Sequence, residues 1–238
     1  PVSLSYVNIK GKRAQECGME FSLVQLSETA TDEEVIQAIQ TEQQKQNLCG
    51  LIVQLPLPQG LNSELILQAI NPEIDVDGIN PMTKNTLTTP LVPPTAGAIM
   101  HILDSLVEDF SMDLQSQKYV VLGNGDLVGK PVAQELQKRG FNFTTVLSET
   151  QNRAEILRTA TVIISGVGKA GVLTGEEVSE GVIIIDAGTS ESGGSIAGDV
   201  DFETVAPKAK LITPSPGGVG PVTVAKLLEN VLINAEQK

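Results

Sequence analysis

The chain has 238 residues, of which 41% are hydrophobic and 19% charged, so it can build a core and is not a disordered protein. Its 29 acidic and 16 basic residues give a net charge of −13, which argues against nucleic acid as a partner. Two cysteines and one histidine argue against a disulfide framework and a zinc site. No apolar stretch reaches the ~20 residues of a membrane-spanning helix, and no signal peptide is recognisable, so we expect a cytoplasmic protein without a membrane partner.

The first 110 residues alternate helix and strand signals, which predicts α/β architecture. Thr31 and Glu34 have the spacing of a capping box, and Gly18 has the place of a residue that follows a helix. The long stretch 71–94 contains five prolines and is expected to be a loop that is either functional or disordered. We predict helices over 4–17, 31–47, 62–70 and 96–109, and strands over 20–26 and 48–55.

From residue 118 onward the alternation becomes stricter and predicts a doubly wound, dinucleotide-binding domain with a parallel sheet. Pro131 suits the first turn of a helix, and Gly140 suits its end. We predict strands over 118–122, 142–146, 161–165, 182–186 and 210–213, and helices over 131–140, 153–159 and 222–236.

A glycine-rich turn, Gly123 to Pro131, lies between a predicted strand and a predicted helix. Backbone N–H groups and the helix dipole can hold a pyrophosphate at such a place, although a turn without function would also be rich in glycine. Glycines also follow the predicted strands 161–165 and 182–186, so three strand ends outline one cofactor crevice. The predicted cofactor-binding residues are Gly123, Asn124, Gly125, Asp126, Val128, Gly129, Lys130, Pro131, Ser148, Gly166, Val167, Gly168, Gly188 and Thr189.

Four polar positions in the first half are candidates for a second site. Tyr6 and Lys10 share a helix face and could hold a flat ligand beside an amine, although an ordinary amphipathic helix explains them as well. Gln54 ends an apolar segment before a proline turn, where its side chain would face a cleft. Asp75 and Asp77 alternate in an extended loop, so either could bind an amidine-like ring edge or simply form a turn.

The stretch from Thr213 to Thr223 combines three prolines with three glycines between a predicted strand and the last predicted helix. Such a composition fixes an unusual backbone that a plain connection would not need, which favours a functional loop.

Five segments in order along the chain resemble the bifunctional methylenetetrahydrofolate dehydrogenase/methenyltetrahydrofolate cyclohydrolase family. They cover nearly the whole sequence. The matching segments are Tyr6-Val-Asn-Ile-Lys-Gly-Lys12, Gly50-Leu-Ile-Val-Gln-Leu-Pro-Leu-Pro58, Pro72-Glu-Ile-Asp-Val-Asp-Gly78, Gly198-Asp-Val200 and residues 213–223.

The resemblance implies that Lys10 is the central catalytic residue and that Gln54 hydrogen-bonds and orients it. It implies further that Tyr6 stacks on the folate and that Asp77 anchors the pterin through its amidine edge. These four form the expected catalytic set. The expected substrate-binding set is Tyr6, Lys10, Gln54, Leu55, Pro56, Asp77, Pro216, Gly217, Gly218 and Pro221.

The implied reaction oxidises 5,10-methylenetetrahydrofolate to the methenyl cation with NADP, NAD being possible, and then hydrolyses the cation to 10-formyltetrahydrofolate. Hydride transfer would depend on positioning, whereas hydrolysis needs proton transfer, for which a neutral lysine is suited. The implied fold is a folate lobe of residues 1–95 plus 222–238 and a Rossmann-like cofactor domain of residues 96–221. A homodimer through the cofactor domain and a role in purine biosynthesis are also implied.

Three departures from the family pattern bear on these expectations. A strand and a helix usually precede the Tyr–Lys helix, whereas this sequence opens on Pro1 within it, which predicts a folate lobe without a central strand. The cofactor turn reads Gly123-Asn-Gly125 where an arginine is common. Leu147 replaces a frequent histidine before Ser148, which with nearby Arg153 is a candidate for the 2′-phosphate.

Two alternatives stay open. The chain could be a dehydrogenase without efficient cyclohydrolase activity, or a non-catalytic folate- or nucleotide-binding paralogue. Measured turnover would exclude the second, and accumulation of methenyltetrahydrofolate would indicate the first.

Overall fold

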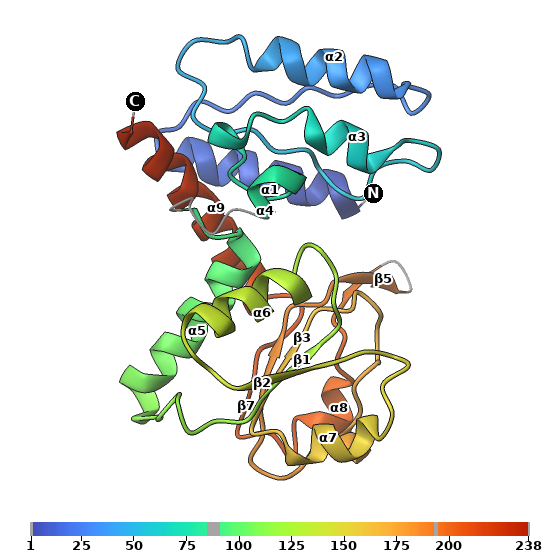
Figure 1. The fold of residues 1–238 in the computed structure, drawn as a ribbon, viewed down its shortest axis with the longest axis vertical. Coiled ribbons are helices and arrows are strands. Elements are labelled where there is room, and N and C mark those ends of the chain that lie inside the picture. Colours follow the sequence, from blue (N-terminus) through green and yellow to red (C-terminus); the bar gives the residue numbers. More distant parts are fainter. Residues whose placement is uncertain (1, 85–90, 193–194, 238) are drawn as a thin grey trace. The chain divides into compact units, whose positions relative to one another are not determined.

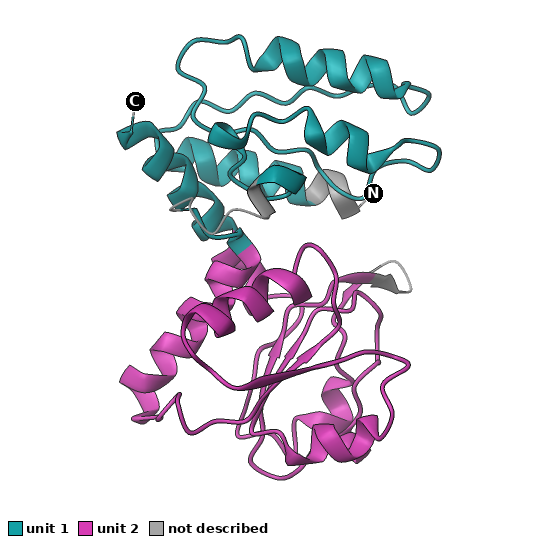
Figure 2. Cartoon of the chain, viewed as in Figure 1, with its two compact units in different colours: residues 1–94, 224–238 teal, residues 95–223 magenta. Residues whose placement is uncertain are grey.

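The structure is a computed structural model that describes residues 2–84, 91–192 and 195–237, so part of the long proline-containing loop lies outside the described residues. The chain divides into two compact units (Figure 2). Unit 1 comprises residues 1–94 and 224–238, and unit 2 comprises residues 95–223. Within the described residues no helix is long and apolar enough to cross a membrane.

Unit 2 is built on a five-stranded parallel sheet with the order β2-β1-β3-β4-β7 (Figure 1). The chain moves from β1 to β2 on one side and then returns to β3 on the other, so the winding direction reverses between β1 and β3. The doubly wound α/β fold expected from the sequence is confirmed. The strands are β1 (Tyr119–Leu122), β2 (Phe143–Val146), β3 (Val162–Ser165), β4 (Ile183–Asp186) and β7 (Leu211–Ile212).

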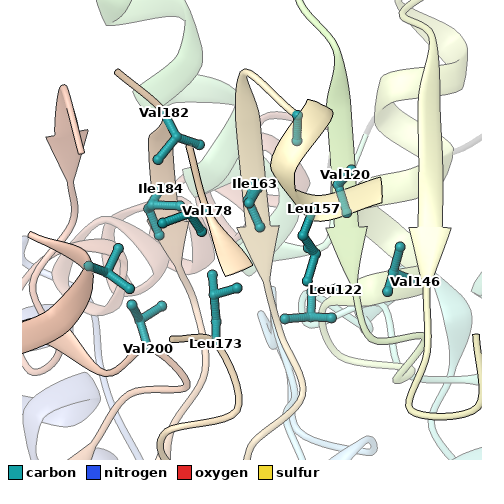
Figure 3. Packing of buried hydrophobic residues seen from close by; sticks show 12 residues of the cluster. Val120, Leu122, Val146, Leu157, Ile163, Leu173, Val178, Val182, Ile184 and Val200 are labelled. Carbon is teal, nitrogen blue, oxygen red and sulfur yellow. The ribbon is translucent and has the colours of Figure 1, made fainter. Parts of the chain in front are cut away.

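The sheet has apolar side chains on both faces, as a parallel sheet covered by helices requires. Figure 3 shows one face, where alternate strand residues pack against Leu157 of a helix and against Leu173 and Val178 of the loops. The three inner strands β1, β3 and β4 are buried along their whole length. The helices of this unit are α5 (Pro94–Phe110), α6 (Gly129–Lys138), α7 (Arg153–Thr159) and α8 (Phe202–Val205), with a single turn η2 (Gly175–Glu177).

A short antiparallel hairpin in unit 2 was not predicted from the sequence. Its strands are β5 (Ser190–Ser192) and β6 (Ser195–Ala197). The polar and small residues here lack the alternation by which a half-buried strand is recognised, so pattern reading had no signal.

Unit 1 is mainly helical and is closed by the last helix of the chain. Asn230 of that helix donates to the carbonyl groups of Val76 and Val92, and Asn234 donates to those of Cys49 and Glu73. The return of the C-terminal helix to the first lobe is therefore confirmed. The elements are α1 (Val2–Glu16), α2 (Asp32–Glu42), α3 (Ser63–Gln68), η1 (Pro72–Ile74), α4 (Pro81–Lys84) and α9 (Val219–Glu236).

Local helix signals were read correctly. Thr31 and Glu34 form the capping box, with Thr31 N donating to Glu34 Oε2 at 2.9 Å and Glu34 N to Thr31 Oγ1 at 3.3 Å. Gly18 has a φ of 77° and ends α1 with two backbone bonds, from Gly18 N to Gln15 O and from Met19 N to Ala14 O. Helix α9 begins three residues before the predicted start because Pro221 lies in its first turn, where a missing N–H costs nothing.

The strands predicted over 20–26 and 48–55 are wrong, because the structure describes both segments without regular strand pairing. The second segment makes a single parallel bridge, from Leu51 to Asp75, with Leu51 N donating to Ile74 O at 2.8 Å. Its apolar side chains pack against the helical core that contains Val35 and Ile66. The hydrophobic pattern of residues 48–55 thus identified a buried segment correctly. A strand, however, also needs a neighbouring strand to which its backbone N–H and C=O groups can bond.

Candidate active site

The catalytic candidates of unit 1 begin on α1. Val7, Gly11 and Ala14 form its buried stripe, and Tyr6 and Lys10 lie half-buried at the edge of that stripe. A side chain at Gly11 would collide with the Phe21 ring, since a Cβ there would lie 2.7 Å from the ring. The close approach of Phe21 to Gly11 holds α1 in place, and with it the direction of the Lys10 side chain.

Lys10 is joined to the segment before the proline turn by one hydrogen bond. Its Nζ donates to Gln54 Oε1 at 3.2 Å, across a separation of 44 residues. Gln54 Nε2 in turn donates to the Leu55 carbonyl at 2.8 Å, which orients the amide so that its oxygen faces the amine. The peptide bond between Leu55 and Pro56 is cis. The amine of Lys10 is therefore held by an acceptor that carries no charge.

Asp75 and Asp77, which the sequence treated as equivalent, have different surroundings. Asp75 is fully buried and accepts hydrogen bonds from Gly78 N at 3.0 Å and Asn80 N at 2.8 Å, so it forms the turn. Asp77 is half-buried beside the charges of Lys10 and Asp75. Burial raises the pKa of Asp77, the Lys10 ammonium partly offsets this, and the Asp75 carboxylate adds to it.

The four polar residues of unit 1 thus combine an amine, a neutral amide, a carboxylate and a phenol. Burial raises the pKa of the Tyr6 phenol, so its ring is a neutral, half-buried surface at neutral pH. An amine within reach of a neutral acceptor can move a proton, and a half-buried carboxylate can accept paired N–H donors from a flat ring. The arrangement fits a planar, nitrogen-rich ligand that undergoes proton transfer.

The glycine turn of unit 2 lies at the carboxyl ends of β1 and β3. A Cβ at Gly129 would lie 2.3 Å from the Gly123 carbonyl oxygen, and one at Gly166 would lie 2.3 Å from the Val128 side chain. Gly123 itself has a φ of 100°, and a Cβ there would lie 3.0 Å from Gly166 O. The two loops therefore pack backbone to backbone, and a side chain at any of these three glycines would force them apart.

This place is where the strand order reverses, which is where doubly wound sheets bind their ligands. The other residues of the predicted cofactor set lie on the same edge of the sheet. Lys130 at the start of α6 pairs with Asp126 at 2.8 Å, and Gly168 lies near the Thr189 carbonyl. The residues present fit a dinucleotide bound through its pyrophosphate.

Two buried carboxylates that support these loops were missed as functional residues by the sequence reasoning. Asp199 accepts four hydrogen bonds from the end of β3, from Ser165 Oγ and from the N–H groups of Val167, Gly168 and Lys169, at 2.6 to 2.9 Å. Its position in the Gly198-Asp-Val200 segment was noted only as part of the resemblance. The aspartate in this segment could have been identified as a hydrogen-bond acceptor for a loop. Its spacing in the sequence, however, does not indicate which loop Asp199 contacts.

Asp186, at the end of β4, holds the neighbouring loop in the same way. It accepts from the N–H groups of Gly188, Asp199 and Val200. Burial raises the pKa of Asp186, while these three backbone donors lower it and the nearby Asp199 carboxylate raises it. A Cβ at Gly188 would lie 2.0 Å from the Asp199 carboxylate, so the glycine is required by the packing of the two carboxylates.

The proline- and glycine-rich loop of unit 2 has an unusual backbone. The peptide bond before Pro216 is cis, Gly217 has a φ of 124°, and Gly218 N donates to Pro214 O at 2.7 Å. A Cβ at Gly218 would lie 2.6 Å from Thr213 Cβ. The loop leads directly into α9, whose first turn contains Pro221.

Ser148 and Arg153, the candidates for a 2′-phosphate, both have partners within the chain. The Arg153 guanidinium binds the Glu177 carboxylate and donates to the Val172 carbonyl at 2.7 Å. Ser148 donates to Glu149 Oε2 at 2.9 Å. Sequence proximity placed Arg153 near Ser148, but α7 carries the arginine toward the turn η2.

Comparison with known proteins matches each unit to a domain model of the same family. Residues 1–77 match the family model of the tetrahydrofolate dehydrogenase/cyclohydrolase catalytic domain, and residues 93–238 match that of its NAD(P)-binding domain. The second match includes α9, which packs on unit 1 in the structure.

Similar proteins are found among sequences and among solved structures. The bifunctional protein FolD of Staphylococcus carnosus is 40% identical over 235 residues, which are 97% of this chain and 81% of the relative. FolD of Campylobacter jejuni is 36% identical with a TM-score of 0.89, covering 100% of this chain and 84% of the other. The Trypanosoma brucei enzyme, solved with NADP and an inhibitor, is 34% identical with a TM-score of 0.89, covering 99% and 82%.

Proposed function

We propose how the site residues divide the work in this chain, which belongs to the tetrahydrofolate dehydrogenase/cyclohydrolase family. The chain is an NADP-dependent methylenetetrahydrofolate dehydrogenase and methenyltetrahydrofolate cyclohydrolase of one-carbon metabolism. In our proposal the polar residues of unit 1 bind and convert the folate, and the glycine loops of unit 2 bind the dinucleotide. The domain division that we propose follows the two compact units, with α9 completing the folate lobe.

The glycine cradle supports the assignment of the cofactor site. The N–H groups at the start of α6 can hold the pyrophosphate, and Asp199 keeps the β3 loop against the β1 loop. When bound, the nicotinamide accepts the hydride that leaves the methylene carbon. The proposed cofactor-binding residues are Gly123, Asn124, Gly125, Asp126, Val128, Gly129, Lys130, Pro131, Ser148, Gly166, Val167, Gly168, Gly188 and Thr189.

Lys10 is the proposed proton-transfer group of the hydrolysis. The observation that carries this role is the bond from its Nζ to Gln54 Oε1, which aims the amine with a neutral partner. Water that attacks the methenyl carbon must lose a proton, and the ring nitrogen that leaves must gain one, and a held amine can serve both transfers. Gln54 is a positioning residue in this scheme, because it acts on the substrate through Lys10.

Tyr6 and Asp77 are the proposed folate-binding groups. The half-buried ring of Tyr6 offers a flat surface one helical turn from Lys10, and the Asp77 carboxylate can accept two N–H donors from the pterin edge. Asp75 does not compete for this role, because the loop backbone already bonds its carboxylate. Leu55, Pro56, Pro216, Gly217, Gly218 and Pro221 complete the proposed substrate set on the strength of their motifs.

The test is a spectrophotometric assay with 5,10-methylenetetrahydrofolate and NADP on the wild type, Lys10→Met and Lys12→Met. Lys12 is the matched control, because it is an exposed lysine on the same helix. We expect the wild type and Lys12→Met to reduce NADP without lasting methenyl product. Lys10→Met should accumulate methenyltetrahydrofolate, with hydrolysis reduced by about 10²–10⁴-fold. Accumulation in the wild type would identify a dehydrogenase alone, and unchanged hydrolysis in Lys10→Met would exclude the role of the lysine.

Three further proposals rest on the family resemblance and go beyond the site. They are a homodimer formed through unit 2, a cytoplasmic location, and supply of one-carbon units to purine biosynthesis. The mass of the protein in solution tests the first, because a chain of 238 residues would sediment or scatter as twice its own mass.

A further inference from the structure

The loop after β2 is where a doubly wound dinucleotide domain meets the ribose of the adenosine. An acidic side chain at this place accepts the ribose 2′-hydroxyl, whereas an arginine accommodates a 2′-phosphate. In this chain β2 lies beside β1 and ends at Val146, and the loop that follows reads Leu147-Ser-Glu-Thr-Gln-Asn152. Glu149 stands 20 positions after Gly129, the glycine at the start of α6.

Glu149 is a fully exposed carboxylate fixed to its own loop. It accepts a hydrogen bond from Ser148 Oγ at 2.9 Å, so the proton of that hydroxyl is already donated within the loop. Its own backbone N–H and then the Ser148 hydroxyl hold the pKa of Glu149 below its usual range, so the group is charged at neutral pH.

The basic residues closest in sequence to this loop and to the glycine turn are engaged elsewhere. Arg153 binds Glu177 and the Val172 carbonyl. Lys130 pairs with Asp126 at 2.8 Å. The loop itself, residues 147–152, contains no lysine or arginine. A 2′-phosphate would therefore enter beside a carboxylate whose repulsion no residue of the loop offsets.

We propose that Glu149 is a specificity-determining residue that weakens binding of the 2′-phosphate and accepts the ribose 2′-hydroxyl, so that this enzyme takes NAD as well as NADP. The inference rests on the proposed cofactor site and deepens it, because it concerns one end of the same ligand.

The experiment measures binding of NADP and of NAD by calorimetry, without folate, to the wild type, Glu149→Gln and Glu180→Gln. Glu180 is the matched control: it is exposed and lies before β4, at the opposite edge of the sheet. We expect wild-type Kd values for the two dinucleotides within about tenfold of each other. Glu149→Gln should tighten NADP relative to NAD by about fivefold at low salt, and the shift should shrink as salt screens it.

A second pair of variants tests the role of Ser148. Ser148→Ala should change the NADP to NAD ratio less in the wild-type background than in Glu149→Gln, because Glu149 already holds the hydroxyl. In the Glu149→Gln background the same change should remove part of the gain, since a neutral amide holds the hydroxyl less strongly than a carboxylate does and leaves it more available to the phosphate. The difference between the two backgrounds measures the coupling of the pair.

Several results would overturn the proposal. One is a shift in the ratio of less than about threefold in Glu149→Gln, or an equal shift in Glu180→Gln, which would mean that only the overall charge matters. Another is a wild-type preference for NADP above about tenfold. Binding of neither dinucleotide would overturn the cofactor site itself and this inference with it, whereas normal binding without turnover would leave the inference standing and contradict the proposed activity.

Discussion

Units 1 and 2 hold their candidate functional residues in different ways. In unit 2 a regular parallel sheet brings three strand ends to one edge, and buried carboxylates fasten the loops that follow. In unit 1 the site rests on a helix and on loops held by single side chains, such as Gln54, Asn80 and Asn230. Backbone pairing positions the candidate site of unit 2, whereas isolated polar contacts position that of unit 1. The two sites should therefore respond differently to single substitutions.

The largest expected effect is in unit 2, from Gly129→Ala. The new Cβ would lie 2.3 Å from the Gly123 carbonyl oxygen, so the backbone of the turn must move. We expect hydride transfer to NADP to fall by about 100-fold or more, because misplacement of a positioned group by ~1 Å costs that much. Hydrolysis of added methenyltetrahydrofolate should stay within about twofold of the wild type, because the proposed hydrolytic residues lie in unit 1.

Gly125→Ala provides the contrast for that variant, since a Cβ there has open space and meets only Gly166 O at 3.9 Å. It should cost far less than Gly129→Ala. Equal losses in both variants would show that the backbone contact between the loops does not set the cofactor site.

Gln54→Ala tests whether a single side chain positions the chemistry of unit 1. The variant removes the acceptor of the Lys10 amine, so hydrolysis should fall by about tens of fold while NADP binding is unchanged. Gln37→Ala, on an exposed face of α2, is the control. A fall in NADP affinity equal to the fall in hydrolysis would contradict the division of work between the units.

Asp199→Asn probes the support of the β3 loop. The amide retains one oxygen acceptor, but its nitrogen is a donor. In the better of its two orientations it still faces the Val167 N–H, so at least one of the four bonds becomes repulsive. We expect Kd for NADP to rise by about tenfold, with hydrolysis of added methenyltetrahydrofolate kept. Asp201→Asn, two residues along, should change neither value, and a loss of both activities would indicate a general loss of folding.

The smallest expected effect is a pH dependence that sets Asp77 apart. Burial raises the pKa of Asp77. The proposed folate-binding role of Asp77 needs its ionised form. KM for methylenetetrahydrofolate should therefore rise as pH falls, by about twofold at that raised pKa. Asp77→Asn should have a high KM at every pH and no such inflection. A profile with the same inflection in this variant would assign the titration to another group.

The contribution of Asp77 to folding stability depends on pH in the opposite direction to its contribution to substrate binding. A raised pKa means that the folded chain binds its proton more tightly than the unfolded chain does. Stability from this group is therefore present at low pH and is lost as pH rises from the ordinary carboxyl pKa through the raised one. Asp77→Asn should melt higher than the wild type at neutral pH, which thermal unfolding can check.

The sequence by itself determined the elements whose signals are local. The capping box at Thr31, the αL glycine at Gly18 and the glycine turn at Gly123 are read from adjacent residues, because their hydrogen bonds close within a few positions. The apolar runs of β1, β3 and β4 were likewise visible, because a strand covered on both faces has no polar side to hide it. The candidate residues of both sites also came from local motifs.

Only the tertiary structure decided which residues meet. Residues 20–26 and 48–55 have the composition of strands but lack regular partners, and no local pattern reveals whether a neighbour is present. Asp75 and Asp77 look alike in sequence, yet the loop buries one and leaves the other beside Lys10. Asp199 reaches back more than 30 positions to the β3 loop, and Arg153 turns away from Ser148 to Glu177. Burial and hydrogen bonding between distant segments are properties of the folded chain, so they could be assigned only there.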